Sequence, residues 1–263
     1  MRCLLIVFAL LLAGCELADT ISGLGADDLA MARKAHSERN WPLAERLLGR
    51  YLREEQHPEK RWEAWQLLLA ALNGARQESR ASLECLELML IEYERDEARV
   101  AEILAAMGKY NEALRHYDKA ANAWSAYVEL AGVDAGAKLE GLRNLARDQL
   151  AQRHFDAAEE TLQQCMALPL PDSRKTWCML DLADASMSKG QFQETADLCQ
   201  QILDSEPDEQ IMGQAAWLRG DALEQLGDLR GALAQFEQGR DSYPNPAVMD
   251  NRIAWLKKQL KIK

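Results

Sequence analysis

Apolar residues recur every three or four positions along most of the chain, which is the period of an amphipathic helix. The segment 247–260 is an example, because it places Met249, Ile253, Leu256 and Leu260 on one helical face. Pro42 falls at the first turn of a predicted helix, and the other prolines lie between predicted helices: Pro58, Pro169, Pro171, Pro207, Pro244 and Pro246. Proline is tolerated at these places and breaks a helix elsewhere. The pattern predicts an all-α fold.

The N-terminal segment has a different pattern. Arg2 is followed by an unbroken apolar run, Leu4–Leu12, of nine residues. A helix needs roughly 20 apolar residues to span a bilayer, so this run has the size of a signal-peptide core. The tetrapeptide Leu12-Ala13-Gly14-Cys15 that follows resembles the lipobox of bacterial lipoproteins. An ordinary secretory signal cut nearby, or a buried hydrophobic N-terminus, is the alternative.

The lipobox resemblance implies a location for the protein. Residues 1–14 would be the signal peptide, Cys15 would carry the lipid and become the mature N-terminus, and residues 15–28 would form a flexible tether. The two or three acyl chains of a lipoprotein hold it firmly at a membrane facing the periplasm. Glu16 follows the cysteine. In lipoproteins an Asp at this position favours retention in the inner membrane, so the resemblance implies the outer membrane for this protein.

From Leu29 onward the chain repeats itself. Small residues, turns and apolar positions recur 37 residues apart in the C-terminal half. The three clearest turns are Arg153-His154-Phe155, Gly190-Gln191-Phe192 and Gly227-Asp228-Leu229, preceded by the small residues Ala146, Ala183 and Gly220. Upstream, the same pattern predicts turns at Gly108-Lys109-Tyr110, after Ala101, and at Asn40-Trp41, after Ala32. A sixth, degenerate hairpin is predicted with a turn at Asn73-Gly74 and a second helix over residues 79–93.

This pattern resembles the tetratricopeptide repeat (TPR), in which pairs of antiparallel helices stack in series. The resemblance implies a right-handed α-solenoid of about six TPR-like hairpins over residues 29–263. The helix from about residue 247 would then be the polar cap that the end of such an array needs.

Charge and motifs exclude several classes of function. The formal net charge of −11 disfavours binding to nucleic acid, because attraction to phosphate requires a basic surface. The chain has no phosphate-binding loop, no H-E-x-x-H and no G-x-S-x-G, and its four histidines are scattered. The sequence therefore predicts neither an enzyme nor a cofactor or metal site.

The TPR resemblance also places candidate binding residues. In the TPR register Trp177 and Trp217 take positions of the first helix that line the concave groove where this family binds peptides. Comparable positions in other repeats hold Arg143, Arg147, Arg33 and His36. Aromatic residues beside arginine are typical of interaction hot spots. The alternative is that both tryptophans pack between repeats, as we expect for Trp62, Trp65 and Trp255.

Four cysteines lie in the repeats: Cys85, Cys165, Cys178 and Cys199. Export to the periplasm permits disulfides. Cys165 and Cys178 fall late in one hairpin and early in the next, so they either form a disulfide across the repeat junction or serve as small core residues like the other two.

Together these features predict a non-catalytic scaffold, anchored in the membrane through Cys15, that binds protein partners of the cell envelope. Its organisation resembles two groups of TPR lipoproteins: the subunit that helps to assemble outer-membrane β-barrels, and the pilotins that guide type IV pilus secretins. The alternatives are an enzyme or enzyme-activating lipoprotein of cell-wall metabolism, and a small-ligand binder. The sequence does not select the partner or the oligomeric state.

Overall fold

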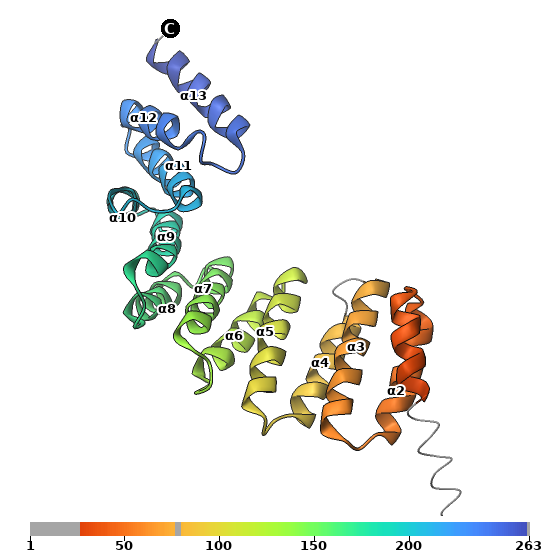
Figure 1. The fold of residues 1–263 in the computed structure, drawn as a ribbon. Coiled ribbons are helices and arrows are strands. Elements are labelled where there is room, and N and C mark those ends of the chain that lie inside the picture. The colour runs from red at the N-terminus through yellow and green to blue at the C-terminus, as the bar shows by residue number, and fades with distance from the viewer. Residues whose placement is uncertain (1–26, 77–79, 262–263) are drawn as a thin grey trace, which may run out of the picture. The chain divides into compact units, whose positions relative to one another are not determined.

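The computed structural model describes residues 27–76 and 80–261, and within these ranges it contains helices and no strand (Figure 1). Residues 27–37 are helical. The elements that follow are α2 (Trp41–Glu54), α3 (Pro58–Arg76), α4 (Arg80–Glu92), α5 (Glu97–Ala113), α6 (Tyr117–Glu129), α7 (Ala135–Ala151), α8 (Phe155–Ala167), α9 (Asp172–Ser188), α10 (Phe192–Asp204), α11 (Glu209–Gln225), α12 (Leu229–Gly239) and α13 (Pro246–Leu260). The predicted class, six helical hairpins and a final helix, is confirmed.

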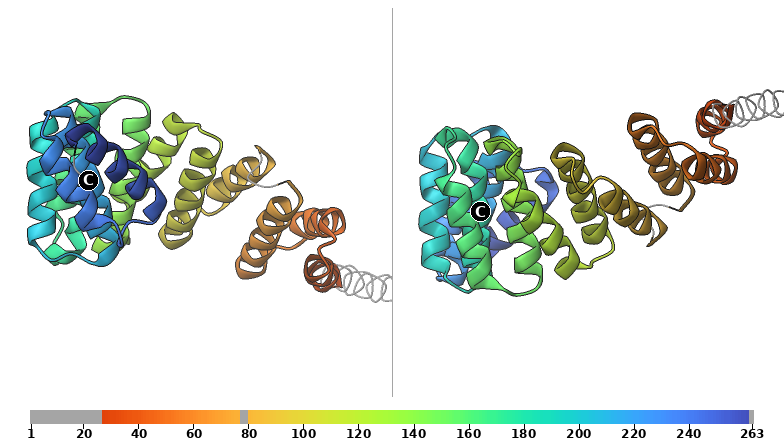
Figure 2. Two further views of the ribbon diagram at one scale, coloured as in Figure 1. Left: turned by 90° about the horizontal axis from the view of Figure 1, so that it is seen from above. Right: turned by 90° about the horizontal axis from the view of Figure 1, so that it is seen from below.

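The chain divides into two compact units. Unit 1 ends at Asp96 and holds the described helices up to α4, whereas unit 2 begins at Glu97 and holds α5 to α13. In unit 2 each helix packs on the next one along the chain (Figures 1 and 2). The first helix of a hairpin also contacts the first helix of the next, α7 with α9 and α9 with α11. One wall of unit 2 is therefore built from first helices.

The described turns inside the hairpins share one backbone conformation. Each of these five turns contains a residue in the left-handed region, with φ between 57° and 84°, at Arg39, Arg115, Arg153, Gly190 or Gly227. Glycine adopts this conformation at no steric cost, whereas arginine does so only when the surrounding structure holds it. These residues fix the register of the repeats.

A small residue seven positions before the turn faces a larger one on the second helix. A Cβ atom on Gly220 would lie 2.5 Å from the ring of Phe236, and one on Gly108 would lie 2.4 Å from the ring of Trp124. Where the first helix has Ala146 instead, the facing residue is the smaller Leu162, and both are fully buried in one cluster. The two helices of a hairpin are therefore matched in size.

Two predicted turns are wrong. Gly108-Lys109-Tyr110 lies inside α5, and the actual turn is centred on Arg115, seven residues later. Gly108, and not Ala101, is the small residue that receives the facing ring. Likewise Asn73-Gly74 lies within α3, where Gly74 contacts the ring of Trp41. In both places glycine provides space for an aromatic side chain, and the sequence does not distinguish this use of glycine from a turn.

The predicted cap is confirmed as α13, whose Met249, Ile253 and Leu256 are buried with Phe236 in one core cluster. The expectation that Trp255 belongs to the core is wrong, because 45% of this side chain is exposed and Arg252 lies over its ring, 5.3 Å from the centroid. Trp255 falls on the exposed face of α13.

The structure joins Cys165 and Cys178 in a disulfide with an S–S distance of 2.08 Å, which links α8 to α9 across the repeat junction. Cys85 and Cys199 are free and buried. Burial raises the pKa of each of these two thiols to about 12, so both stay protonated.

Candidate functional site

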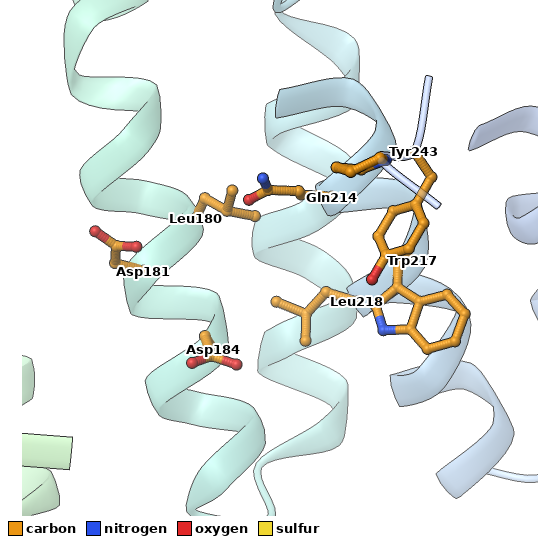
Figure 3. Close-up of a pocket in the computed structure, with 8 residues that line it drawn as sticks. Leu180, Asp181, Asp184, Gln214, Trp217, Leu218 and Tyr243 are labelled. Carbon is orange, nitrogen blue, oxygen red and sulfur yellow. The ribbon is translucent and has the colours of Figure 1, made fainter. Parts of the chain in front are cut away.

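A half-open pocket of about 290 Å³ lies between α9, α11 and the connection that precedes α13 (Figure 3). We call it the α9–α11 pocket. Its lining residues are Leu180, Asp181, Asp184, Gln214, Trp217, Leu218, Tyr243 and Pro244. Leu180 and Trp217 stand at equivalent places, each ten residues before the left-handed glycine of its own hairpin. Successive first helices therefore build this pocket because they repeat in register.

Aromatic rings form one side of the pocket. Trp217 stacks on Tyr243 with 5.2 Å between ring centroids and 24° between planes, and its other neighbour is Phe236 at 5.2 Å. Trp217 is half-buried by these contacts. It is thus packed against the last core cluster and also lines the pocket, which combines the two alternatives that the sequence left open.

One carboxylate of the pocket is already paired. Arg143 of α7 donates to Asp181 through Nε at 2.5 Å and Nη2 at 3.3 Å. The same guanidinium lies over the ring of Trp177, 4.7 Å from its centroid. Burial raises the pKa of Asp181, and the Arg143 charge acts in the opposite direction.

The second carboxylate of the pocket is unpaired. Asp184 is one turn along α9 from Asp181, remains accessible to solvent, and has no hydrogen bond or ion pair with any described residue. Desolvation and the nearby charge of Asp181 raise its pKa. Gln214 and the indole N–H of Trp217 also have no hydrogen-bond partner within the described part of the chain. The pocket therefore offers several polar groups that the protein itself does not use.

On the next first helix, the acidic residue equivalent to Asp184 has a counter-charge. Arg252 of α13 donates to Glu224 at 2.7 Å and lies 3.9 Å from Asp221. Asp221 stands 37 residues after Asp184, and burial raises its pKa. Asp184, in contrast, has no cation within ion-pair distance among the described residues.

The structure separates the candidate binding residues predicted from the sequence. Arg143, Arg147, Trp177 and Trp217 lie in unit 2. Of these four, Trp217 alone lines the α9–α11 pocket, and Arg143 lies over the ring of Trp177. Arg143 is only 13% exposed, so it is not a free cation. Arg147 is exposed and donates to Asn144.

Two further candidates lie in unit 1. Arg33 is paired with Glu63 through contacts of 2.7 and 2.8 Å, and the ring of His36 packs edge-on against Trp41 with 5.1 Å between centroids. Both therefore have partners inside unit 1. Cys15, the predicted lipidation site, lies outside the described residues.

Asp181, Asp184, Gln214 and Tyr243 were not predicted as site residues. The repeat itself carried a signal for two of them, because Asp184 lies 37 residues after Arg147 and Gln214 lies 37 residues after Trp177, each at the equivalent position of the next first helix. Tyr243 gave no such signal, since the equivalent positions of the two preceding connections hold Glu206 and Pro169.

The lining residues limit the chemistry of this pocket. It has no histidine, cysteine or serine, so it holds no serine–histidine or cysteine–histidine pair. Within residues 27–76 and 80–261 no three His, Cys, Asp or Glu side chains are grouped as metal ligands. None of the described helices combines the length and the hydropathy that crossing a bilayer requires. The arrangement is suited to binding a polar or cationic group.

No protein-family model matches this chain, and no curated protein sequence matches it. Several solved structures have a similar fold. They include the apo form of RapI (TM-score 0.64, 8% identity, 90% of this chain and 72% of that chain), a tetratricopeptide repeat protein from Parabacteroides merdae (0.53, 11%, 89% and 98%) and pilF of Pseudomonas aeruginosa (0.53, 12%, 91% and 99%). At these identities the likeness establishes the fold alone. The chain has the fold of a tetratricopeptide repeat protein.

Proposed function

We propose that this protein is a non-catalytic, membrane-anchored scaffold of the cell envelope that binds a segment of a partner protein on the first-helix wall of unit 2. The observation that carries the proposal is the α9–α11 pocket, where Asp184, Gln214 and Trp217 present polar groups without partners inside the described structure. The fold supports it, because TPR-like neighbours are interaction scaffolds.

The envelope location in this proposal depends on the lipobox-like residues before Cys15. A lipid anchor confines the protein to the membrane surface and thereby raises its effective concentration around partners in the same membrane. We propose the outer membrane as its site and the assembly of an outer-membrane, secretion or pilus complex as its process. The fold that this chain shares with pilF is compatible with this proposed process, but it does not identify the process.

An enzyme remains the second candidate because of one feature, the two carboxylates Asp181 and Asp184 in a single pocket. Paired carboxylates are the usual acid and base of glycoside cleavage. Here, however, Arg143 engages one of them, and a scaffold explains the unpaired one equally well.

Site-specific photo-crosslinking in cells tests the scaffold proposal. A benzophenone amino acid replaces Gln214 in the pocket or, as the matched control, Gln201, an exposed glutamine on the second helix α10. We expect a discrete crosslinked partner from position 214 and none from position 201. Equal products from both positions, or no product from position 214, would contradict the proposal.

A further inference from the structure

The α9–α11 pocket carries one uncompensated negative charge. The charge of Asp181 is balanced by Arg143, whereas Asp184 has no cation within ion-pair distance among the described residues. A carboxylate without a counter-ion attracts a cation brought to it, and a hydrogen bond between two charged groups is stronger than one between neutral groups. The electrostatics of the pocket therefore favour a ligand with one positive charge.

Apolar and aromatic side chains line the pocket alongside Asp184. Leu180 and Leu218 come from α9 and α11, and the rings of Trp217 and Tyr243 lie on the far side of the pocket (Figure 3). Lysine and arginine carry an aliphatic stem that packs on such surfaces while the charged end reaches a polar group. An aromatic ring adds a favourable cation–π contact.

The polar groups at the rim suit a peptide backbone. Gln214 is half-buried on α11 and offers one donor and one acceptor group that no described residue uses. An amide in this place can pair with the main chain of an extended segment while a side chain of that segment enters the pocket. An isolated cation such as a metal ion would find too few ligands here, since no third carboxylate, histidine or cysteine lines the pocket.

We propose that the α9–α11 pocket binds a single basic side chain, lysine or arginine, of the partner segment, with Asp184 as its counter-charge. This inference rests on the proposed scaffold function and specifies the chemistry of the partner. The partner segment is therefore basic at one defined position, and Trp217 contacts the stem of that residue.

The test uses the full chain and small probes of known charge. Nα-acetyl-arginine methylamide is titrated into the protein while the indole N–H signal of Trp217 is followed by NMR, with Trp217→Phe to assign the signal. The citrulline analogue has nearly the same shape and no charge, so it measures binding without the ion pair. Asp184→Asn removes the counter-charge, and Asp197→Asn, at an exposed site on α10, makes the same charge change away from the pocket.

We expect a saturable shift with the arginine probe and binding weaker by about tenfold or more with citrulline or in Asp184→Asn, the typical effect of losing a charge-assisted hydrogen bond. Asp197→Asn should bind as the unmodified protein does. Absence of a shift, equal binding of citrulline, or equal binding by both variants would overturn the inference. A crosslinked partner at position 214 together with any of these results would leave the scaffold function standing and reject only the basic side chain.

Discussion

At the scale of single residues, the repeats are held together by pairs matched in size and charge. Gly220 accepts the ring of Phe236, and Arg143 connects the ring of Trp177 to the carboxylate of Asp181. Both kinds of contact join segments that are distant in sequence, by 16 and by 34 to 38 residues. The effect of substituting one member of a pair on stability therefore depends on the residue at the other member.

The first prediction concerns the size match. Gly220→Ala should lower the free energy of unfolding by about 1–3 kcal/mol, because the new methyl group would overlap the ring of Phe236. Phe236→Leu alone should cost roughly 1–2 kcal/mol through the space it leaves. The double variant recreates the pair seen at Ala146 and Leu162, so it should lose less than the sum of the two. Denaturant unfolding of all four proteins measures the coupling, and strictly additive losses would contradict the size match.

The second prediction concerns a buried acid outside the pocket. Asp148 is 2% exposed, and one of its carboxylate oxygens, Oδ2, has no hydrogen-bond partner in the described structure. Desolvation, together with the charge of Glu112, raises its pKa from 3.8 to about 7, against the opposing effect of Arg147. The folded protein therefore keeps this proton up to about pH 7, whereas the unfolded chain releases it near pH 4.

The linkage between this proton and folding sets the direction of the effect. Asp148 does not lower the free energy of unfolding below about pH 4, where it is protonated in both states. The free energy of unfolding then falls as the pH rises to about 7, and it stays at the lower value above that pH. Asp148→Asn removes the charge, so it should be more stable than the unmodified protein by about 2–4 kcal/mol at pH 8 and nearly equal to it at pH 4. Thermal unfolding across this range measures the difference, with Asp197→Asn as the control. A difference that does not change with pH would show that Asp148 titrates normally.

At the scale of helices, the sequence predicted most of the hairpins correctly and two turns incorrectly. The periodic apolar faces and the 37-residue spacing suffice to place α7 to α12, because each uses a recognisable turn. The turn before α6 depends on Arg115 in a left-handed conformation, as the correctly predicted turn before α8 depends on Arg153, but here a glycine, the residue that usually marks such turns, stands seven positions earlier. The turn was therefore predicted at Gly108, although this glycine lies inside α5 and leaves space for the ring of Trp124.

The third prediction concerns the junction between α8 and α9. The disulfide between Cys165 and Cys178 closes a loop with a sequence separation of 13, which stabilises a folded chain by about 3 kcal/mol if it acts mainly on the unfolded state. A reductant should lower the midpoint of thermal unfolding, and Cys165→Ser combined with Cys178→Ser should remove this sensitivity. Unchanged melting of the unmodified protein under reductant would mean that the bond contributes no stability.

At the scale of the whole molecule, the candidate site was less predictable than the fold. Trp217 was identified from its register, but its pairing with Tyr243 and the neutralisation of Asp181 by Arg143 depend on how neighbouring hairpins pack. The residues involved lie 26 and 38 positions apart, and a sequence gives their spacing without their contacts. The unpaired state of Asp184 could be recognised only after its neighbours were assigned their partners.

The fourth prediction concerns the anchor. Cys15→Ser removes the thiol that the lipobox resemblance identifies as the acylation site. We expect the variant to incorporate no labelled fatty acid and to lose its membrane association, because the diacylglyceryl chains would supply the binding energy. Labelling with palmitate followed by membrane fractionation measures both effects. Normal labelling of the variant would reject Cys15 as the lipid carrier.

The size matching of facing helices also restricts how such an array can be rearranged. A hairpin that carries Gly220 and Phe236 can be transplanted whole, since the cavity and the ring that fills it travel together. A single helix cannot, because Gly opposite Leu leaves a void and Ala opposite Phe produces a clash. Duplication or recombination with a boundary inside a hairpin therefore lowers the stability of the folded chain, whereas a boundary between hairpins leaves each matched pair intact. Chimeras with a second TPR array should respect the same boundaries.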